Sequence, residues 1–312
     1  MLNCTLSIII VNWNSGQLLR ECVSSIALSI QDGFSIIQVI VVDNGSSDES
    51  LDGVDQLTVP VQVIRNIENR GFAAACNQGG SVAIGDYLLF LNPDTRLFVD
   101  SLSKPIYFMQ QPSSSRIGIC GIRLVDEEGH PSTSAARFPT LRVMTGRTLG
   151  LSLPLPKVFP AHLLTSADLM ESGIVDQVIG AFFLIRRNVF VRCNGFDERF
   201  FVYFEEVDLA IRAKRLGYAS YFLSEASAYH KGGGCSESVR ASRLFYSLRS
   251  RILYAQKHYS NVDCNMLILL TMLELPLRLV QGLLRFSASD VNNTFIAYRQ
   301  LASYFWRRGL WH

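Results

Sequence analysis

Acidic side chains follow two apolar runs of the sequence, at positions that suit them for chemistry. Asp43 comes directly after the run 38–42, and Asp94 follows the run 87–91 by three residues. A carboxylate at the end of a buried strand can accept hydrogen bonds from a ribose or a nucleobase, or hold a divalent cation that bridges two phosphates. The alternative is a turn, because residues 92–94 (Asn-Pro-Asp) are typical of a loop. We favour binding for Asp43, whereas Asp94 taken alone favours the loop.

Three more carboxylates gather within four residues, at Glu205, Glu206 and Asp208, and aromatic residues flank them. One of them could act as a general base that takes a proton from a sugar hydroxyl. Acidic residues are also stabilised at a helix start by its dipole, and Asp208 and Arg212 have the i, i+4 spacing of a helical ion pair. His230, which precedes a run of glycines, is a candidate metal ligand or hydrogen-bond donor to a diphosphate.

The elements that must position these residues alternate along the chain. We expect strands buried on both faces over 6–11, 38–42, 61–64 and 87–91, with helices over 16–30 and 72–84. This alternation predicts an α/β domain with right-handed crossovers, whose ligands bind beyond the carboxyl ends of the strands. Farther on we expect strands over 117–125, 178–185 and 218–223, a helix over 205–216, and a loop over the proline-containing residues 140–170.

Composition and missing motifs exclude several classes of protein. The first predicted strand leads into residues 12–16, which carry neither the GxGxxG of dinucleotide-binding domains nor the GxxxxGK[ST] of a P-loop. With 29 basic and 27 acidic residues among 312, the net charge of +2 argues against nucleic acid as a partner. Seven scattered cysteines without a CxxC pair, and no secretory signal, indicate reduced thiols in a cytoplasmic protein.

The charge is unevenly divided along the chain. Residues 240–312 hold ten basic and three acidic side chains, a net charge of +7, which leaves −5 for the first 239 residues. We therefore expect a catalytic domain over 1–236 and a basic, amphipathic helical region over 237–312. Its apolar segment 266–286 is interrupted by charged residues, which favours a helix lying on a membrane surface over a span. The alternative is an ordinary helical subdomain or a homodimer interface.

Six motifs follow one another in an order that carries a family resemblance. Over about residues 5–260 the chain resembles the inverting glycosyltransferase family 2, most closely its bacterial rhamnosyltransferase branch. The motifs are VNWNS, VVDNGSSD, NRGFAAACNQG, LNPDT, GAFFLIRRNVF and GFDERFFVYFEEVDLAIRAKRLGY. The resemblance implies a GT-A fold, which is a Rossmann-like, mostly parallel sheet flanked by helices, together with a nucleotide-diphospho-sugar donor and a divalent metal, Mg²⁺ or Mn²⁺.

The resemblance also assigns roles to residues of this chain. It implies donor-nucleotide binding by Asp43, Arg70 and Asn77. We assign Asn12 and Asn92 to the same site, although residues 12–16 could equally be an ordinary helix N-cap. Asn92 replaces the first Asp of the family's DxD motif, and Asp94 matches its last Asp and would touch the metal with His230. Gly180 and Ala181 match small residues on the floor of the sugar site. Glu206 matches the catalytic base, with Asp208 and Glu205 as competitors, and Glu205 is also assigned to the acceptor site.

The activity implied is inverting transfer of a sugar, with L-rhamnose from dTDP-rhamnose as our specific expectation. The acceptor would be a hydroxyl of a polyprenyl-diphosphate-linked saccharide in cell-surface polysaccharide synthesis, at the cytoplasmic face of the cell membrane. Alternatives are a UDP- or GDP-hexose or UDP-galactofuranose donor, or a nucleotide-sugar-binding subunit without activity. A nucleotidyltransferase would need a glycine-rich basic loop after the first strand, which residues 12–16 do not supply.

Overall fold

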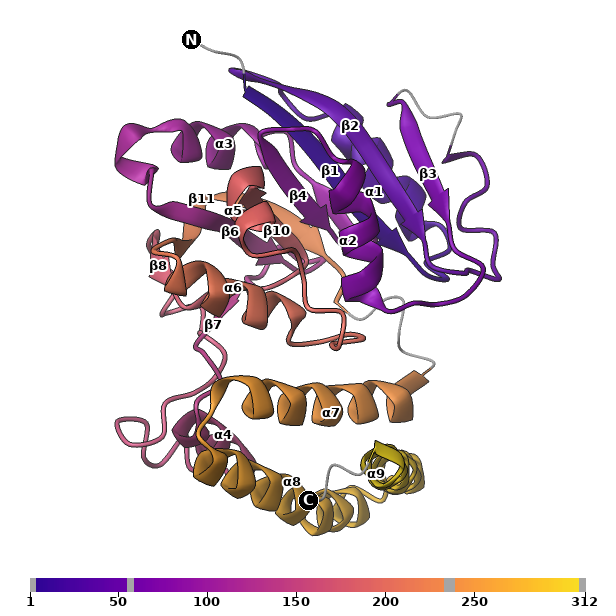
Figure 1. Ribbon diagram of the computed structural model, residues 1–312, viewed down its shortest axis with the longest axis vertical. Helices are drawn as coiled ribbons and strands as arrows, with labels where there is room; N and C mark the ends of the chain where they lie inside the picture. The colour runs from indigo at the N-terminus through magenta and orange to yellow at the C-terminus, as the bar shows by residue number, and fades with distance from the viewer. Residues whose placement is uncertain (1–3, 55–58, 233–238, 309–312) are drawn as a thin grey trace. The chain divides into compact units, whose positions relative to one another are not determined.

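The computed structural model describes residues 4–54, 59–232 and 239–308 (Figure 1). The chain divides into two compact units, which are treated separately below. The first comprises Met1–Phe138, Leu163–Glu198 and Glu205–Cys235, and the second comprises Pro139–His162, Arg199–Phe204 and Ser236–His312. Two segments from before residue 236 thus belong to the unit of the C-terminal helices. The functional division expected at residue 236 stays a prediction.

Within its described residues, the first unit is built on a nine-stranded mixed sheet (Figure 1). The strand order is β3-β2-β1-β4-β10-β6-β11-β5, with β8 paired to β11. Strands β1 to β4 run parallel, β11 is parallel to β6, and β10 is antiparallel to both its neighbours. The strands are β1 (Cys4–Asn12), β2 (Phe34–Asp43), β3 (Val61–Arg65), β4 (Tyr87–Leu91), β5 (Thr95–Leu97), β6 (Ile117–Val125), β8 (Gly173–Val175), β10 (Phe182–Arg186) and β11 (Ala219–His230).

Helices cover both faces of this sheet, which is why its strands are continuous apolar runs. Alternate residues of β1 show it, because Ile8 and Ile10 pack in one buried cluster while Ile9 and Val11 pack in another. The first cluster includes residues of α1 (Leu18–Ala27) and α3 (Ser103–Gln110), and the second includes residues of α2 (Phe72–Val82), α5 (Arg187–Arg192) and α6 (Glu205–Arg215). A 3-10 turn, η2 (Pro112–Ser114), follows α3. The predicted α/β class is confirmed.

Two predicted elements differ from the structure. The run expected as one strand over 178–185 is broken, because β9 (Gln177–Val178) pairs with β7 (Ala135–Ala136) in a separate small sheet and only β10 joins the main sheet. The expected loop over 140–170 contains α4 (Leu141–Thr148). Thr140 caps this helix, since its hydroxyl accepts a hydrogen bond from the Val143 N–H at 3.3 Å.

The second unit is helical, and consists of α4, α7 (Arg240–His258), α8 (Asn261–Leu284) and α9 (Ala288–Arg308) with the loops between them. Its core joins Leu248 and Ile252 of α7 to Leu301 and Phe305 of α9. Within the described chain, α8 is the one helix long and apolar enough to cross a bilayer by length and composition. The six described cysteines are free, and all but Cys4 are buried, as expected for reduced thiols.

Candidate active site

The carboxyl edge of the parallel strands brings several predicted residues together. Asn12 and Asp43 are the last residues of β1 and β2 and are paired in the register of the sheet. Strand β4 pairs with the other side of β1, and Asn92 and Asp94 follow its last residue. The chain order therefore reverses at β1, which is the place where open α/β sheets bind ligands.

A buried amide fixes the carboxylate of Asp43. The Asn12 Nδ2 donates to Asp43 Oδ1 at 2.8 Å and to the hydroxyl of Ser50 at 2.8 Å. The backbone N–H of Ser46 donates to the other oxygen of Asp43 at 3.3 Å. Asn12 has no exposed surface, so its side chain supports Asp43, and a direct contact of Asn12 with a nucleotide stays a prediction.

Asn44 organises a neighbouring loop, a role that its sequence neighbourhood did not predict. Its Oδ1 accepts hydrogen bonds from the Arg70 backbone N–H at 3.0 Å and from Asn66 Nδ2 at 3.1 Å, and its Nδ2 donates to Asn69 Oδ1 at 2.9 Å. The exposed side chain of Arg70 is carried by this loop. The Asn-Gly pair at 44–45 indicated only a turn, since no local signal predicts partners more than 20 residues away.

Asn77 of α2 is engaged by another part of the first unit. Its Oδ1 accepts a hydrogen bond from the Phe196 N–H at 2.8 Å, and its Nδ2 donates to the Phe196 carbonyl at 2.9 Å and to Glu198 Oε1 at 3.0 Å. These contacts tie α2 to the chain that leads toward Glu205. The contact of Asn77 with a nucleotide stays a prediction.

The two predicted metal ligands face each other. Strand β5 pairs with β11 so that Thr95 lies opposite His230, and this register places His230 Nε2 3.4 Å from Asp94 Oδ1. The imidazole Nε2 is buried and has no hydrogen-bond partner among the residues that the structure describes. An unsatisfied nitrogen beside a carboxylate oxygen fits a divalent cation, with phosphate oxygens and water as its remaining ligands. The donors present therefore fit Mg²⁺ or Mn²⁺.

Another group of candidate metal ligands lies outside this site. The side chains of Asp126, Glu128 and His130 offer ligand atoms that lie within 4.8 Å of one another. Glu128 and His130 are exposed, and Asp126 accepts hydrogen bonds from the backbone of both. The group is thus explained as the turn after β6.

Glu205 and Glu206 begin α6 with partly unsatisfied carboxylates. One oxygen of each is buried and finds no hydrogen-bond partner in the described part of the chain. Burial raises the pKa of Glu205 well above its ordinary value and the neighbouring Glu206 raises it further, while burial raises the pKa of Glu206. A Cβ placed on Gly180 would lie 3.9 Å from the Cγ of Glu206. The predicted sugar-site glycine and the predicted base are therefore neighbours.

The carboxylate of Asp208, unlike those of Glu205 and Glu206, is paired with a positively charged side chain. It is fully buried, and its Oδ2 accepts a hydrogen bond from Arg212 Nε at 2.7 Å. The i, i+4 spacing predicted this pair. Ala181 joins the site through its carbonyl oxygen, which accepts a hydrogen bond from the Asn92 N–H at 3.0 Å. The backbone thus links the predicted sugar floor to the residue that precedes Asp94 by two positions.

Comparison of the sequence with known proteins gives concordant matches. Residues 7–192 match the model of the family "Glycosyl transferase family 2". The chain is 25% identical over 271 residues to the N-acetylglucosaminyl-diphospho-decaprenol L-rhamnosyltransferase of Mycobacterium tuberculosis, across 82% of this chain and 85% of that enzyme. It is 28% identical over 171 residues to rhamnosyltransferase WbbL of Escherichia coli K12, across 54% of this chain and 61% of that protein.

Solved structures share the fold. The mannosyltransferase PcManGT of Pyrobaculum calidifontis, in complex with GDP-Man and Mn²⁺, aligns over 97% of this chain and 88% of its own, with a TM-score of 0.57 and 13% identity. GalNAc-T7 with UDP, GalNAc and Mn²⁺ aligns over 73% of this chain and 44% of its own, with a TM-score of 0.56 and 17% identity. At these identities the likeness shows the GT-A fold alone, as predicted.

Proposed function

The chain belongs to glycosyl transferase family 2, and on that premise we propose that it transfers a sugar to a saccharide hydroxyl with inversion at the anomeric carbon. The observation that carries the proposal is the pair of buried carboxylate oxygens of Glu205 and Glu206 that find no partner among the described residues, with Glu206 beside Gly180. A single displacement needs one base to take the proton of the acceptor hydroxyl. Without a hydrogen bond to another side chain, a carboxylate oxygen is free to accept that proton.

Glu206 is the proposed base. Its raised pKa makes its ionised form a stronger base than an exposed Glu, and it lies against Gly180. Asp208 is the weaker candidate because Arg212 already occupies its carboxylate. Glu205 lies next to the base, and we assign it to the acceptor side, where its raised pKa favours a protonated carboxyl that can donate a hydrogen bond.

The donor would lie along the carboxyl edge of the sheet. We propose that Asp43, fixed by Asn12, accepts hydrogen bonds from the nucleoside, and that the exposed Arg70 reaches its phosphates. Asn77 and Asn92 line the same pocket in this proposal. Small residues at 180 and 181 leave room for the sugar ring.

We propose that Asp94 and His230 hold a divalent metal through Oδ1 and Nε2, which lie 3.4 Å apart. When bound, Mg²⁺ or Mn²⁺ would neutralise negative charge on the departing diphosphate. Two solved structures that share the fold contain Mn²⁺ together with a nucleotide or nucleotide-sugar, which supports this assignment. Asn92 supplies no charge, so the site depends on Asp94 more than a two-carboxylate site would.

The proposed donor is dTDP-rhamnose and the proposed acceptor is a polyprenyl-diphosphate-linked saccharide. Support comes from the relative of Mycobacterium tuberculosis, whose name specifies L-rhamnose and a decaprenol-linked acceptor and whose length this chain nearly spans. Another hexose or galactofuranose donor would use the same base and metal ligands. A binding subunit without activity is disfavoured because Glu206 and Asp94 are both retained.

We further propose that the second unit lies on the cytoplasmic membrane surface. One face of α8 contributes Leu267 and Leu275 to packing against other helices. Its other face presents a stripe at helical spacing, with exposed fractions from 45% at Met266 to 75% at Leu284. We call this the α8 stripe, and it consists of Val262, Met266, Leu269, Leu273, Leu277, Val280 and Leu284. An apolar face with arginines around it suits a membrane interface, whereas the charged Glu274 and Arg278 disfavour a span.

A donor screen tests the transferase proposal. Purified protein with Mg²⁺ is given dTDP-rhamnose, UDP- and GDP-hexoses or UDP-galactofuranose, each with a polyprenyl-diphosphate N-acetylglucosamine acceptor, and products are identified by mass spectrometry. We expect a deoxyhexose to be added from dTDP-rhamnose, at least about tenfold faster than any other sugar. Transfer of another sugar would correct the donor, and binding without transfer of any sugar would contradict the activity.

A further inference from the structure

A pocket on the second unit combines charged and apolar walls. It has a volume of about 450 Å³ and lies between α8 and the end of α4. Arg147, Arg278 and Gln281 supply polar groups, whereas Leu277, Val280 and Leu284 belong to the α8 stripe. The pocket therefore opens where the exposed apolar face begins, and its polar groups are suited to a ligand with a charged head and an apolar body.

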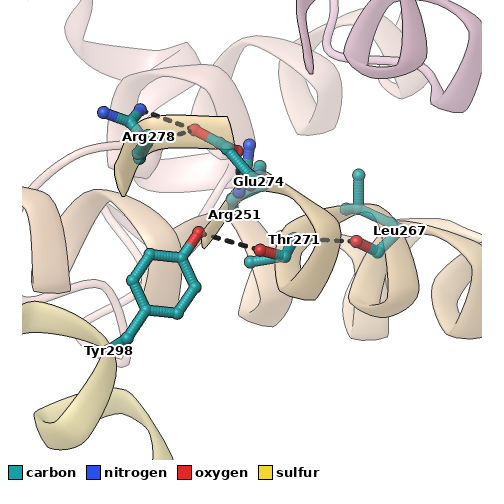
Figure 2. Close-up of polar contacts among 6 residues, drawn as sticks. All are labelled: Arg251, Leu267, Thr271, Glu274, Arg278 and Tyr298. Carbon is teal, nitrogen blue, oxygen red and sulfur yellow. Dashed lines mark hydrogen bonds and ion pairs between the residues drawn. The ribbon is translucent and has the colours of Figure 1, made fainter. Parts of the chain in front are cut away.

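The charge of the pocket wall is unbalanced. Figure 2 shows Glu274 between Arg251 and Arg278, with Arg251 Nη2 2.7 Å from Oε2 and Arg278 Nε 2.7 Å from Oε1. Both oxygens of the one carboxylate are thus already taken by two guanidinium groups. The buried Nε of Arg251 has no acceptor within the described segments of the chain. One negative charge therefore faces two positive charges before Arg147 is added.

Arg147 brings a third positive charge to this region, in which Arg147 and Arg278 line the pocket and the buried Arg251 does not. Among the residues with described positions it has no carboxylate partner, although it lines the pocket together with Glu274 and Arg278. Arg147 is accessible to solvent, yet protein atoms surround enough of its guanidinium to lower its pKa by desolvation, and the positive charge of Arg251 lowers it further. With the buried Arg251, the three arginines near Glu274 leave a net charge of about +2, and Arg147 and Arg278 present it to the pocket, where an anion would balance it.

We propose that this pocket binds the phosphate of an anionic membrane lipid, with Arg147 and Arg278 at the phosphate and the α8 stripe among the acyl chains. Guanidinium groups pair with phosphate oxygens in a bidentate manner, and a lipid phosphate arrives together with the apolar surface that the stripe requires. The inference rests on the proposed membrane association and deepens it. A chain lying on a bilayer through apolar contact alone would need no such cluster.

The test is co-flotation of the full-length protein with vesicles, in 0.5 M NaCl to screen general attraction between charges. Arg147→Gln is compared with Arg142→Gln, which removes the same charge from an exposed position of the same helix outside the pocket. On vesicles of phosphatidylglycerol and phosphatidylcholine, we expect Arg147→Gln to weaken binding about tenfold and Arg142→Gln by less than about twofold. Equal thermal unfolding temperatures would show that both variants fold.

The flotation results distinguish failure of the membrane association from failure of the lipid pocket. Wild-type protein that binds no vesicle, and elutes as a dimer that covers the α8 stripe, would overturn the membrane association itself. Wild-type protein that floats while the two variants weaken equally, or that floats equally well on pure phosphatidylcholine, would overturn the pocket alone. Inorganic phosphate that releases the protein from the vesicles at an equal phosphate concentration would show a free-phosphate site and contradict the lipid assignment.

Discussion

Each of the two neighbouring carboxylates at the start of α6 has a buried oxygen that no described residue contacts by a hydrogen bond. Such an arrangement is unfavourable for the fold, because each ionised group loses water and repels the other. Reactive sites commonly contain groups whose environment lowers the stability of the fold. The raised pKa of Glu205 and that of Glu206 have one main cause, which is their shared burial.

Glu206→Gln should stabilise the protein in neutral solution. The pKa of Glu206 in the folded chain is raised by burial, so the fold binds the proton more tightly than the unfolded chain, and stability falls as pH rises through that pKa. The amide cannot ionise, and we expect it to add about 1 kcal/mol near pH 8, with the difference vanishing below about pH 4. Urea unfolding across pH measures this. The exposed Glu127→Gln is the control and should change little.

Asp94→Asn should weaken metal binding while leaving the fold intact. Without the negative Oδ1 that faces His230, the site retains only neutral ligands, and we expect the Mn²⁺ concentration for half-maximal binding to rise at least about tenfold. Electron paramagnetic resonance of added Mn²⁺ reports binding independently of activity. Asp126→Asn, in the exposed turn after β6, is the control. A larger effect of Asp126→Asn would place the metal in that turn.

Residue types and order predicted which side chains gather at the carboxyl edge, because parallel strands bring their ends together. They could not predict how those side chains are used. Asn12 is a support for Asp43, and Asn77 holds the Phe196 backbone. Such roles depend on partners 31 and 119 residues away, which only the folded chain brings close.

At the scale of elements, the turn after β2 depends on a close approach of two backbones. Gly45 has φ +74°, and a Cβ there would lie 2.8 Å from the carbonyl carbon of Glu68. Its neighbour Asn44 holds the loop that carries Arg70. The strand end and the loop therefore form one structure, which positions the proposed nucleotide contacts.

Gly45→Ala should destabilise the fold by about 2–4 kcal/mol and weaken binding of the sugar nucleotide, because strain and a backbone clash add together. Gly129→Ala is the matched control, since Gly129 has φ +82° and a Cβ placed there would meet no described atom within 4 Å. We expect only about 1 kcal/mol for the control. Urea unfolding and calorimetric titration with the nucleotide measure the two effects. Equal costs at both positions would contradict the close approach.

Helix α7 holds the residues that lead directly into Glu205. Tyr203 and Phe204 have φ of +68° and +72°, a left-handed conformation that costs non-glycine residues roughly 1–2 kcal/mol each. The hydroxyl of Ser250 donates to the Val202 carbonyl at 2.9 Å, and the rings of Phe201 and Tyr246 stack with centroids 4.5 Å apart. These contacts hold the segment 201–204 in place, including the left-handed conformation of its last two residues, which is unfavourable for non-glycine residues.

Ser250→Ala should therefore lower kcat roughly fivefold while leaving the donor KM unchanged. The substitution would loosen the segment that positions the proposed base Glu206, but it would not alter the carboxylate itself. Ser247→Ala, one turn earlier in α7, is the control, since the Ser247 hydroxyl forms no hydrogen bond with another described residue. Steady-state kinetics with varied donor separate kcat from KM. An unchanged kcat, or a change confined to KM, would contradict this role of α7.

Strands buried on both faces were the most predictable elements, because in an α/β protein a short, continuous apolar run is typical of such a strand. The break between β9 and β10 was not predictable, since VIGAFFLI is apolar throughout and only tertiary pairing sends its first residues to another sheet. Helix α4 was hidden by the prolines that follow it at 154, 156 and 160, although Thr140 carried a capping signal.

At the scale of the whole molecule, charge and apolar surface are unevenly distributed between the sequence regions. The first 239 residues carry a net charge of −5 and residues 240–312 carry +7. The proposed metal and base chemistry uses carboxylates of the first unit, whereas the α8 stripe and its arginines belong to the second. The sequence predicted this functional division, which stays a prediction, but it could not predict which face of α8 is exposed.

Leu269→Gln should reduce binding to phosphatidylglycerol vesicles about fivefold, because the side chain is half-exposed on the α8 stripe and lies outside the arginine pocket. Leu28→Gln, which changes an exposed leucine of the first unit, should leave flotation unchanged. Turnover of a water-soluble acceptor should remain normal in both variants. Equal flotation of the two variants would contradict the membrane role of the stripe.

The proposed role of Glu206 is tested most directly by single-turnover transfer with Glu206→Gln, with donor affinity measured on the same sample by calorimetry. The proposal predicts that transfer falls at least about a thousandfold while the dissociation constant of the sugar nucleotide stays within about twofold. Asp208→Asn serves as the comparison, because its carboxylate is paired with Arg212. Near-normal transfer by Glu206→Gln together with loss of transfer in a folded Asp208→Asn would contradict the assignment of Glu206 as the base.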